Sequence, residues 1–165
     1  MELRFEVGDL AHPEVIALVE LHLREAHRNS PADGVFALDL EGLNNPALTL
    51  WTCWEGERLL GMGALKALGN GRAEIKSMRT APDALRRGVA RVMLHHLLGE
   101  ARARGDVELL LETGANDAFA PARRLYEAAG FRSCAPFGDY ELTEFNCCYS
   151  LAVEQGSGAP AQAGN

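Results

Sequence analysis

The sequence predicts an α/β fold of the α+β type, with a mixed, mostly antiparallel sheet of about six or seven strands and helices on both faces. Strand-like segments separated by short turns follow one another through residues 48–80. An amphipathic helical pattern then connects residues 74–80 to an apolar segment at 107–112, so these two strands should lie parallel. With 165 residues, 47% of them hydrophobic, the chain is long enough to bury a core.

The N-terminal part of the chain should form one strand and two helices. Residues 3–7 alternate apolar and polar side chains, which is typical of a strand. Pro13 can begin a helix, and apolar residues recur at helical spacing from there to about residue 28. Residues 29–34 have the composition of a turn, and we expect a shorter helix at 36–43.

Three strands should follow as an antiparallel meander. Residues 48–54, 59–68 and 74–80 are strand-like segments separated by the turns 55–58 and 69–71. The third strand ends at an Ala-Pro-Asp loop, because proline lacks the N–H group that a strand ladder needs.

The remaining elements alternate between helices and strands. A helix at 88–104 ends at Gly105, a residue suited to the left-handed cap of a helix, and residues 107–112 have the composition of a buried strand. A further amphipathic helix at 119–129 ends at Gly130. The last two strands begin at Phe131 and span 145–151.

The composition bounds the domain organisation and the cellular context. We expect residues 1–153 to form a single domain and residues 154–165, which are rich in Gly, Ala, Gln, Ser and Pro, to form a disordered tail. A net charge of −7 disfavours a nucleic-acid partner. No apolar run reaches the length of a membrane span and the chain begins without a signal peptide, so we expect no membrane partner and a cytoplasmic location.

The four cysteines do not indicate a metal site. They are scattered along the chain without a Cys-x-x-Cys pair, and no histidine lies at zinc-site spacing from them. We therefore expect small buried thiols and no bound metal.

The segment 85–91 carries the clearest chemical pattern. Arg86 and Arg87 precede Gly88, which lets the backbone turn at the start of a helix. Unpaired N–H groups at a helix N-terminus bind anions, and the arginines add positive charge. This pattern indicates a site for a phosphate-bearing ligand, which could enter where the parallel strands 74–80 and 107–112 splay apart and expose their backbone.

Three short motifs stand in order along the chain. Residues 78–82 read Met-Arg-Thr-Ala-Pro, residues 85–90 read Leu-Arg-Arg-Gly-Val-Ala, and residues 125–131 read Leu-Tyr-Glu-Ala-Ala-Gly-Phe. They resemble the Leu-x-Val-x-Pro strand, the Gln/Arg-x-x-Gly-x-Gly/Ala motif for acetyl-CoA and the Leu-Tyr-x-x-x-Gly-Phe segment of the GCN5-related N-acetyltransferase (GNAT) family. The order of elements agrees from residue 3 to residue 151, so the chain resembles a bacterial-type member of that family.

Two positions depart from the family pattern. The first position of the acetyl-CoA motif is Leu85 instead of Gln or Arg. The asparagine that is common near the start of the later helix is replaced by Phe119, and Asn116, about one turn earlier, is the candidate substitute. Because backbone N–H groups hold most of the pyrophosphate, Leu85 should leave that contact intact.

The resemblance implies an N-acetyltransferase with acetyl-CoA as cosubstrate and no metal. Its acceptor would be a primary amine, with a small molecule as the leading candidate, which attacks directly in a ternary complex. Two alternatives remain open, a non-catalytic acyl-CoA-binding module and a protein or peptide N-acetyltransferase. A homodimer is common among such relatives, and the sequence leaves the oligomeric state open.

The resemblance assigns ten residues to the cofactor. The segment 86–91 would line the pyrophosphate, and the backbone of the strand ending at Thr80 would bind the pantetheine arm. The ten residues are Met78, Arg79, Thr80, Arg86, Arg87, Gly88, Val89, Ala90, Arg91 and Asn116.

Two residues are the catalytic candidates. An aliphatic amine is only about one part in a thousand neutral at pH 7, so a base in reach helps its attack. By resemblance this base is Glu74; the alternatives are a surface carboxylate paired with Lys76 or Arg72, a rival base at Glu112, and a water relay. Tyr126 occupies the position of the family's general acid, and its alternative is a core tyrosine with a bonded hydroxyl.

The acceptor side is the least defined part of the site. In this family the first helices and the loop between them often form the wall of the acceptor pocket. The residues there that could contact an acceptor are His22, His27, Ser30 and Phe36.

Overall fold

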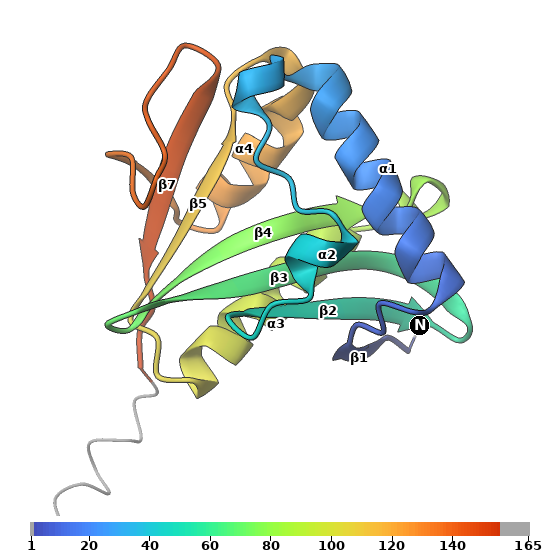
Figure 1. The fold of residues 1–165 in the computed structure, drawn as a ribbon. Helices are drawn as coiled ribbons and strands as arrows, with labels where there is room; N and C mark the ends of the chain where they lie inside the picture. Colours follow the sequence, from blue (N-terminus) through green and yellow to red (C-terminus); the bar gives the residue numbers. More distant parts are fainter. Residues whose placement is uncertain (1, 156–165) are drawn as a thin grey trace, which may run out of the picture.

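The computed structural model describes residues 2–155, and in that range a seven-stranded sheet is flanked by helices (Figure 1). The strands are β1 (Arg4–Val7), β2 (Leu48–Glu55), β3 (Arg58–Gly69), β4 (Arg72–Thr80), β5 (Glu108–Gly114), β6 (Arg132–Cys134) and β7 (Asn146–Ala152). The helices are α1 (Pro13–Asn29), α2 (Leu40–Leu43), α3 (Val89–Ala103) and α4 (Ala120–Ala128), with short 3₁₀ turns at 32–34, 82–84 and 117–119.

The sheet confirms the predicted fold class. Its strand order is β1-β2-β3-β4-β5-β7-β6, and within the described residues β4 and β5 are the one parallel pair. Helix α3 makes the crossover between them, as the helical pattern after Gly88 predicts. The antiparallel meander of β2, β3 and β4 and the pairing of β7 with β5 complete the mixed sheet.

Helices cover both faces of the sheet because side chains alternate along β3. Gly61 and Gly63 face α3, where a Cβ atom on Gly63 would lie 3.0 Å from Met93 and 3.0 Å from Leu97. These glycines allow α3 to approach the sheet closely. Arg79 pairs in register with Met62, which lies between the two glycines, and therefore points to the opposite face, where it bonds to His22 of α1.

The parallel pairing of β4 with β5 is short, so the two strands separate over most of their length. Only three residues of β4 pair with β5, namely Arg72, Ala73 and Glu74. Beyond Glu74 the two strands separate, although β4 continues to Thr80 and β5 continues to Gly114. Backbone groups along this split are available to a ligand, as predicted for the splayed pair.

The helix predicted at 36–43 is wrong in its first half. Helix α2 contains only Leu40–Leu43, because the Asp39 carboxylate accepts a hydrogen bond from the Gly42 N–H (2.8 Å) and so caps the helix there. The apolar residues 35–38 suggested a helical stripe, but they run without helical structure between α1 and α2. Their side chains serve as a wall of the cavity described below.

The structure describes the first two residues of the expected C-terminal tail. Of the tail expected at 154–165, the structure describes Glu154 and Gln155, whose groups bond to Arg102 and Asp106, and the remainder lies outside the described residues. Among residues 2–155, no helix has the length and apolar character needed to cross a membrane.

Candidate active site

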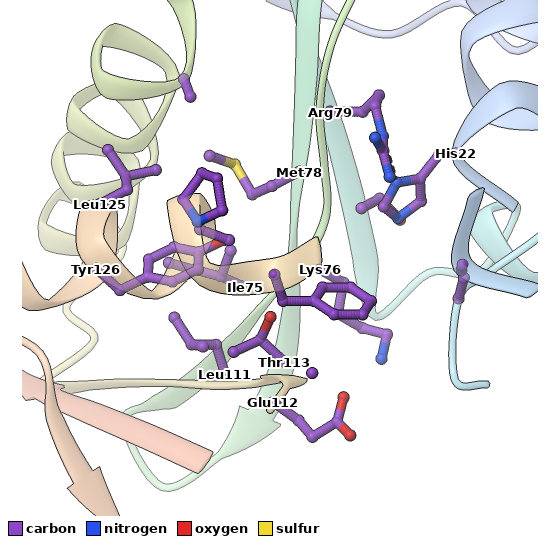
Figure 2. A pocket seen from close by; sticks show the side chains of 18 of the residues that line it. His22, Ile75, Lys76, Met78, Arg79, Leu111, Glu112, Thr113, Leu125 and Tyr126 are labelled. Atoms are coloured by element: carbon purple, nitrogen blue, oxygen red, sulfur yellow. Dashed lines mark hydrogen bonds between the residues drawn. The ribbon is translucent and has the colours of Figure 1, made fainter. Parts of the chain in front are cut away.

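A cavity of about 550 Å³ opens where β4 and β5 separate. It reaches the N-terminus of α3 and helix α4 on one side and α1 with residues 34–38 on the other. Figure 2 shows Met78, Leu125 and Tyr126 on one side of this space and His22 with Arg79 on the other, with Glu112 and Thr113 of β5 below them. Its size lies within the range usual for small-molecule sites.

The loop before α3 has an unusual backbone. Arg86 and Gly88 both have positive φ angles, 63° and 81°, and Gly88 is the N-cap of α3 without a capping side chain among the described residues. The first N–H groups of a helix have no partner within the helix, so the start of α3 presents donors and the positive end of its dipole to the cavity. Glycine suits this position because of its positive φ angle. Lack of space is not the reason, since a Cβ atom there would meet no neighbour within 4 Å.

Eight of the ten predicted cofactor residues line this cavity. Arg87 and Asn116 lie outside its lining. The Arg87 guanidinium pairs with Glu55 at 3.1 Å. Asn116 donates to the Asn29 carbonyl (2.7 Å) and accepts from the Ala118 N–H (3.1 Å), so it joins the end of α1 to the turn before α4. The eight lining residues are Met78, Arg79, Thr80, Arg86, Gly88, Val89, Ala90 and Arg91.

A β-bulge in β4 decides which side chains face which side. Lys76 pairs with Ala64 and Arg79 pairs with Met62, so Ser77 and Met78 together stand opposite the single residue Gly63. Ser77 takes a positive φ of 57°. Lys76 and Arg79 therefore share the face toward α1 despite their odd spacing, while Met78 points toward α3.

Glu74 is buried in a hydrogen-bonded cluster. It is 4% exposed, its Oε2 accepts the Tyr140 hydroxyl at 2.5 Å, and Lys76 Nζ lies 3.4 Å from the same oxygen. Lys76 also donates to the Tyr140 hydroxyl at 2.9 Å. Burial, followed by the Glu74 charge, raises the pKa of Tyr140, so this hydroxyl keeps its proton. The pairing with Lys76 considered from the sequence is present, but in the interior instead of at the surface.

Tyr140 is the residue of this cluster that the sequence analysis missed. It lies in the irregular segment between β6 and β7, where no periodicity relates it to Glu74, 66 positions earlier. Its ring packs edge-on against Phe36 with centroids 5.0 Å apart, so two segments distant in the sequence meet in the cavity lining. Three of the four acceptor-side candidates, His22, Ser30 and Phe36, line the cavity, and His27 does not.

A second carboxyl, Glu112, lines the cavity from β5. Burial raises its pKa; the side chain of Asn146 and the charge of Lys76 act in the opposite direction, and the charge of Glu74 adds a smaller increase. A carboxyl whose pKa is raised is a stronger proton acceptor than an ordinary one. The structure thus brings both carboxylates considered from the sequence to one chamber.

Tyr126 lies on α4 with its ring edge-on to Phe131 and is 6% exposed. Burial raises the pKa of its hydroxyl, which therefore stays protonated at neutral pH. None of the side-chain hydrogen bonds within residues 2–155 involves this hydroxyl, and the residue lines the cavity. A core tyrosine normally bonds its hydroxyl, so this one has a donor to offer to a ligand.

His22 and Arg79 form a neutral–cationic pair. Arg79 Nε donates to His22 Nδ1 at 3.0 Å. Burial, with the charges of Arg79 and Lys76, lowers the pKa of His22 to about 4. His22 is therefore neutral at pH 7 and, because Nδ1 accepts, its hydrogen is on Nε2.

The lowered pKa of His22 predicts a pH dependence of stability. Between its unfolded value of 6.5 and its folded value of about 4, the unfolded chain binds the extra proton, so stability is lost as the pH falls through this window. We expect a loss on the order of 2 kcal/mol between pH 7 and pH 4 that denaturant titration finds in the wild type but not in His22→Gln. Glu112→Gln is the control of opposite sign, because a raised carboxyl pKa favours folding at low pH.

The sheet, the split parallel pair and the start of α3 beside it define a class of α+β proteins with a cavity between two parallel strands. The family model described as Acetyltransferase (GNAT) family matches residues 15–131. The chain therefore belongs to the GNAT family and is an acetyl-CoA-dependent N-acetyltransferase.

Similar proteins agree with this family assignment and with the fold. The chain is 46% identical over 138 residues to the uncharacterized N-acetyltransferase YsnE of Bacillus subtilis, covering 84% of this chain and 91% of that protein. It is 45% identical over 155 residues to the uncharacterized N-acetyltransferase YedL of Escherichia coli, covering 94% and 98%. A Bacillus subtilis acetyltransferase solved in complex with CoA has the same fold, with a TM-score of 0.69 and 19% identity over 93% of this chain and all of that chain.

Proposed function

We propose that the enzyme transfers the acetyl group of acetyl-CoA to a primary amine of a small molecule, by direct attack in a ternary complex. The observation that supports this most is the continuity of the cavity, which runs from the N-terminus of α3 through the split of β4 and β5 to Glu74 and Glu112. N–H groups that could bind a phosphate and carboxyl groups that could accept a proton therefore line the same cavity. The proposal places the enzyme in the cytoplasm, where acetyl-CoA is at hand.

The donor side of the cavity has the features that acetyl-CoA requires. The amides at the start of α3, with Arg86 and Arg91, would hold the pyrophosphate, and the unpaired backbone beyond Glu74 on β4 would bind the pantetheine arm. When bound, acetyl-CoA supplies an activated acetyl group. Tyr126 would donate its proton to the sulfur as the carbon–sulfur bond breaks.

The acceptor side would bind and deprotonate the amine. The Oε2 oxygen of Glu74 accepts hydrogen bonds from Tyr140 and Lys76. Its Oε1 oxygen has no partner among the described side chains of residues 2–155 and is available to an ammonium group in the cavity. We propose Glu74 as the base that takes the amine proton as the new nitrogen–carbon bond forms. Glu112 is the second candidate, because its pKa is raised. Phe36 and Tyr140 pack edge-on and both line the cavity, and such an aromatic wall suits a small acceptor.

The test is acetyl-CoA turnover, followed by thiol release, against amines, polyamines, amino acids, antibiotics and peptides. Turnover on one class of small amine supports the proposal and names the acceptor. Turnover on peptides alone would replace it with a protein-modifying activity, and tight CoA binding without any turnover would indicate a binding module.

The anion site at α3 can be tested separately with Gly88→Asp and Gly88→Asn. Asp and Asn have nearly the same size and both tolerate a positive φ, so the two variants differ mainly in charge. We expect Gly88→Asp to raise the KM for acetyl-CoA by about tenfold over Gly88→Asn, because a negative charge at the helix N-terminus competes with the pyrophosphate. Equal KM values in the two variants would show that the phosphates bind elsewhere.

A further inference from the structure

The acceptor side of the cavity contains a cation without a counter-ion. Arg79 is half-buried and lines the cavity, and among the side chains of residues 2–155 that the structure describes no carboxylate lies within ion-pair distance of its guanidinium. Its one hydrogen bond in that range joins Nε to the neutral His22. Glu25, the acidic residue whose charge it feels, already pairs with Arg28 at 3.1 Å. A buried charge without a partner is costly, so an arginine kept in this state indicates an anion that arrives with a ligand.

The orientation of Arg79 assigns this anion to the acceptor and not to acetyl-CoA. The bulge at Ser77 places Arg79 on the face toward α1, whereas the N-terminus of α3 and Met78 lie on the other face. Resemblance assigned Arg79 to the cofactor, but its side chain lies on the opposite side of β4, as Figure 2 shows for Arg79 and Met78. The other cation of this face, Lys76, is already neutralised by Glu74.

The donors of this corner suit a carboxylate. The two terminal nitrogens of Arg79 are unoccupied within the described range, and they present parallel N–H groups that match the two oxygens of a carboxylate. His22 adds a donor at Nε2, because its Nδ1 is the acceptor of the Arg79 bond. Three donors from β4 and α1 therefore surround one corner of the chamber, and the carboxyl groups of Glu74 and Glu112 line another part of it.

We propose that the acceptor is an amino acid, whose carboxylate binds Arg79 and His22 while its amine lies at Glu74 and Glu112. This proposal rests on the proposed function and narrows its acceptor to molecules that carry both groups. Glu74 pairs with Lys66 and Arg79 pairs with Met62, so the two residues are four strand positions apart on the partner strand. This corresponds to about 13 Å between their Cα atoms. The two side chains and a small amino acid can together span this distance.

The test compares matched acceptors that differ only at the carboxylate. Leucine, leucinamide and isopentylamine form one set, and γ-aminobutyrate with butylamine forms a second set with a longer spacing. We expect kcat/KM for the better amino acid to exceed that of its uncharged partners by about 10- to 100-fold, the range for hydrogen bonds to a charged group. Equal turnover of amino acids and uncharged amines would overturn the inference and leave the proposed function standing.

Two variants connect this preference to Arg79. Arg79→Met should bring the ratio of amino acid to uncharged amine close to one, mainly through the KM of the amino acid. Arg132→Met removes an exposed arginine from β6, outside the cavity lining, and should keep the wild-type ratio. An unchanged ratio in Arg79→Met would contradict the assignment.

A binding measurement separates this inference from the proposed function. Calorimetry with N-acetylleucine and N-acetyl-γ-aminobutyrate, each in the presence of CoA, measures recognition of the carboxylate without turnover. Binding of either compound to the wild type, with at least tenfold weaker binding to Arg79→Met, would support the carboxylate site even if no acceptor is acetylated. Absence of binding, together with turnover of uncharged amines, would refute it.

Stability gives a further readout that a purely structural arginine would not produce. Because Arg79 is an uncompensated charge in the unliganded protein, Arg79→Met should leave the melting temperature unchanged or higher. A clear fall in the melting temperature of the unliganded variant would show that Arg79 has a structural role and would count against the proposal.

Discussion

Glu74→Gln should lower the stability of the protein by about 3 kcal/mol as well as its activity. The Glu74 and Lys76 side chains are 5% and 11% exposed, so removing the carboxylate leaves an ammonium group buried without its anion. Tyr140 also loses the charged acceptor of its 2.5 Å hydrogen bond. Denaturant titration of the wild type and the variant measures this loss directly.

A double-mutant cycle separates the structural part of this effect from the catalytic part. Lys76→Met alone should also destabilise the protein, whereas Glu74→Gln combined with Lys76→Met should recover much of the loss, because both buried charges are then absent. If Glu74 is the base, the double variant regains stability but not kcat. Recovery of kcat together with stability would show that Glu74 only holds the site together.

The pH dependence of the rate distinguishes the two carboxylates. The variant that lacks the base should lose the fall of kcat/KM at low pH. This low-pH limb of the profile reports the pKa of the base in the free enzyme. Loss of that limb in Glu112→Gln, with the limb kept in Glu74→Gln, would transfer the role to Glu112, whose pKa burial already raises.

Tyr126→Phe should reduce kcat by about 100-fold with little change in stability. Tyr126 lines the cavity, and none of the side-chain hydrogen bonds within residues 2–155 involves its hydroxyl, so its removal breaks none of them. Because burial raises its pKa, the group is present as a proton donor over the whole neutral range. Steady-state kinetics with acetyl-CoA and the best acceptor measures the effect.

Tyr149→Phe is the matched control for this prediction. Tyr149 is equally buried, but its hydroxyl donates to Glu127 at 2.8 Å and it lies outside the cavity lining. We expect the opposite result, with a stability loss of about 1 kcal/mol and nearly unchanged kcat. If Tyr126→Phe instead behaved like Tyr149→Phe, the general-acid role would be wrong.

Local patterns predicted most of the fold. Alternating polarity and tight turns located the meander, and the helical pattern after Gly88 required the parallel pairing of β4 with β5. These predictions succeeded because periodicity and turn chemistry act over a few residues and are visible in a single chain. The same reasoning was wrong for residues 36–39, because an apolar run can line a cavity as well as form the buried stripe of a helix. In addition, Asp39 caps the helix, which therefore begins only at Leu40.

The sequence by itself determined the helix that starts at Gly88, and through the resemblance of its short motifs to those of a known family it indicated Tyr126 and Glu74 as candidate site residues. Only the tertiary structure decided the partners of these groups. Tyr140 reaches Glu74 from 66 positions away, and the bulge at Ser77 turns Arg79 toward His22 and away from α3. Both are consequences of strand pairing and loop packing between distant segments, and the pairing register is a property of two strands together that neither strand shows alone.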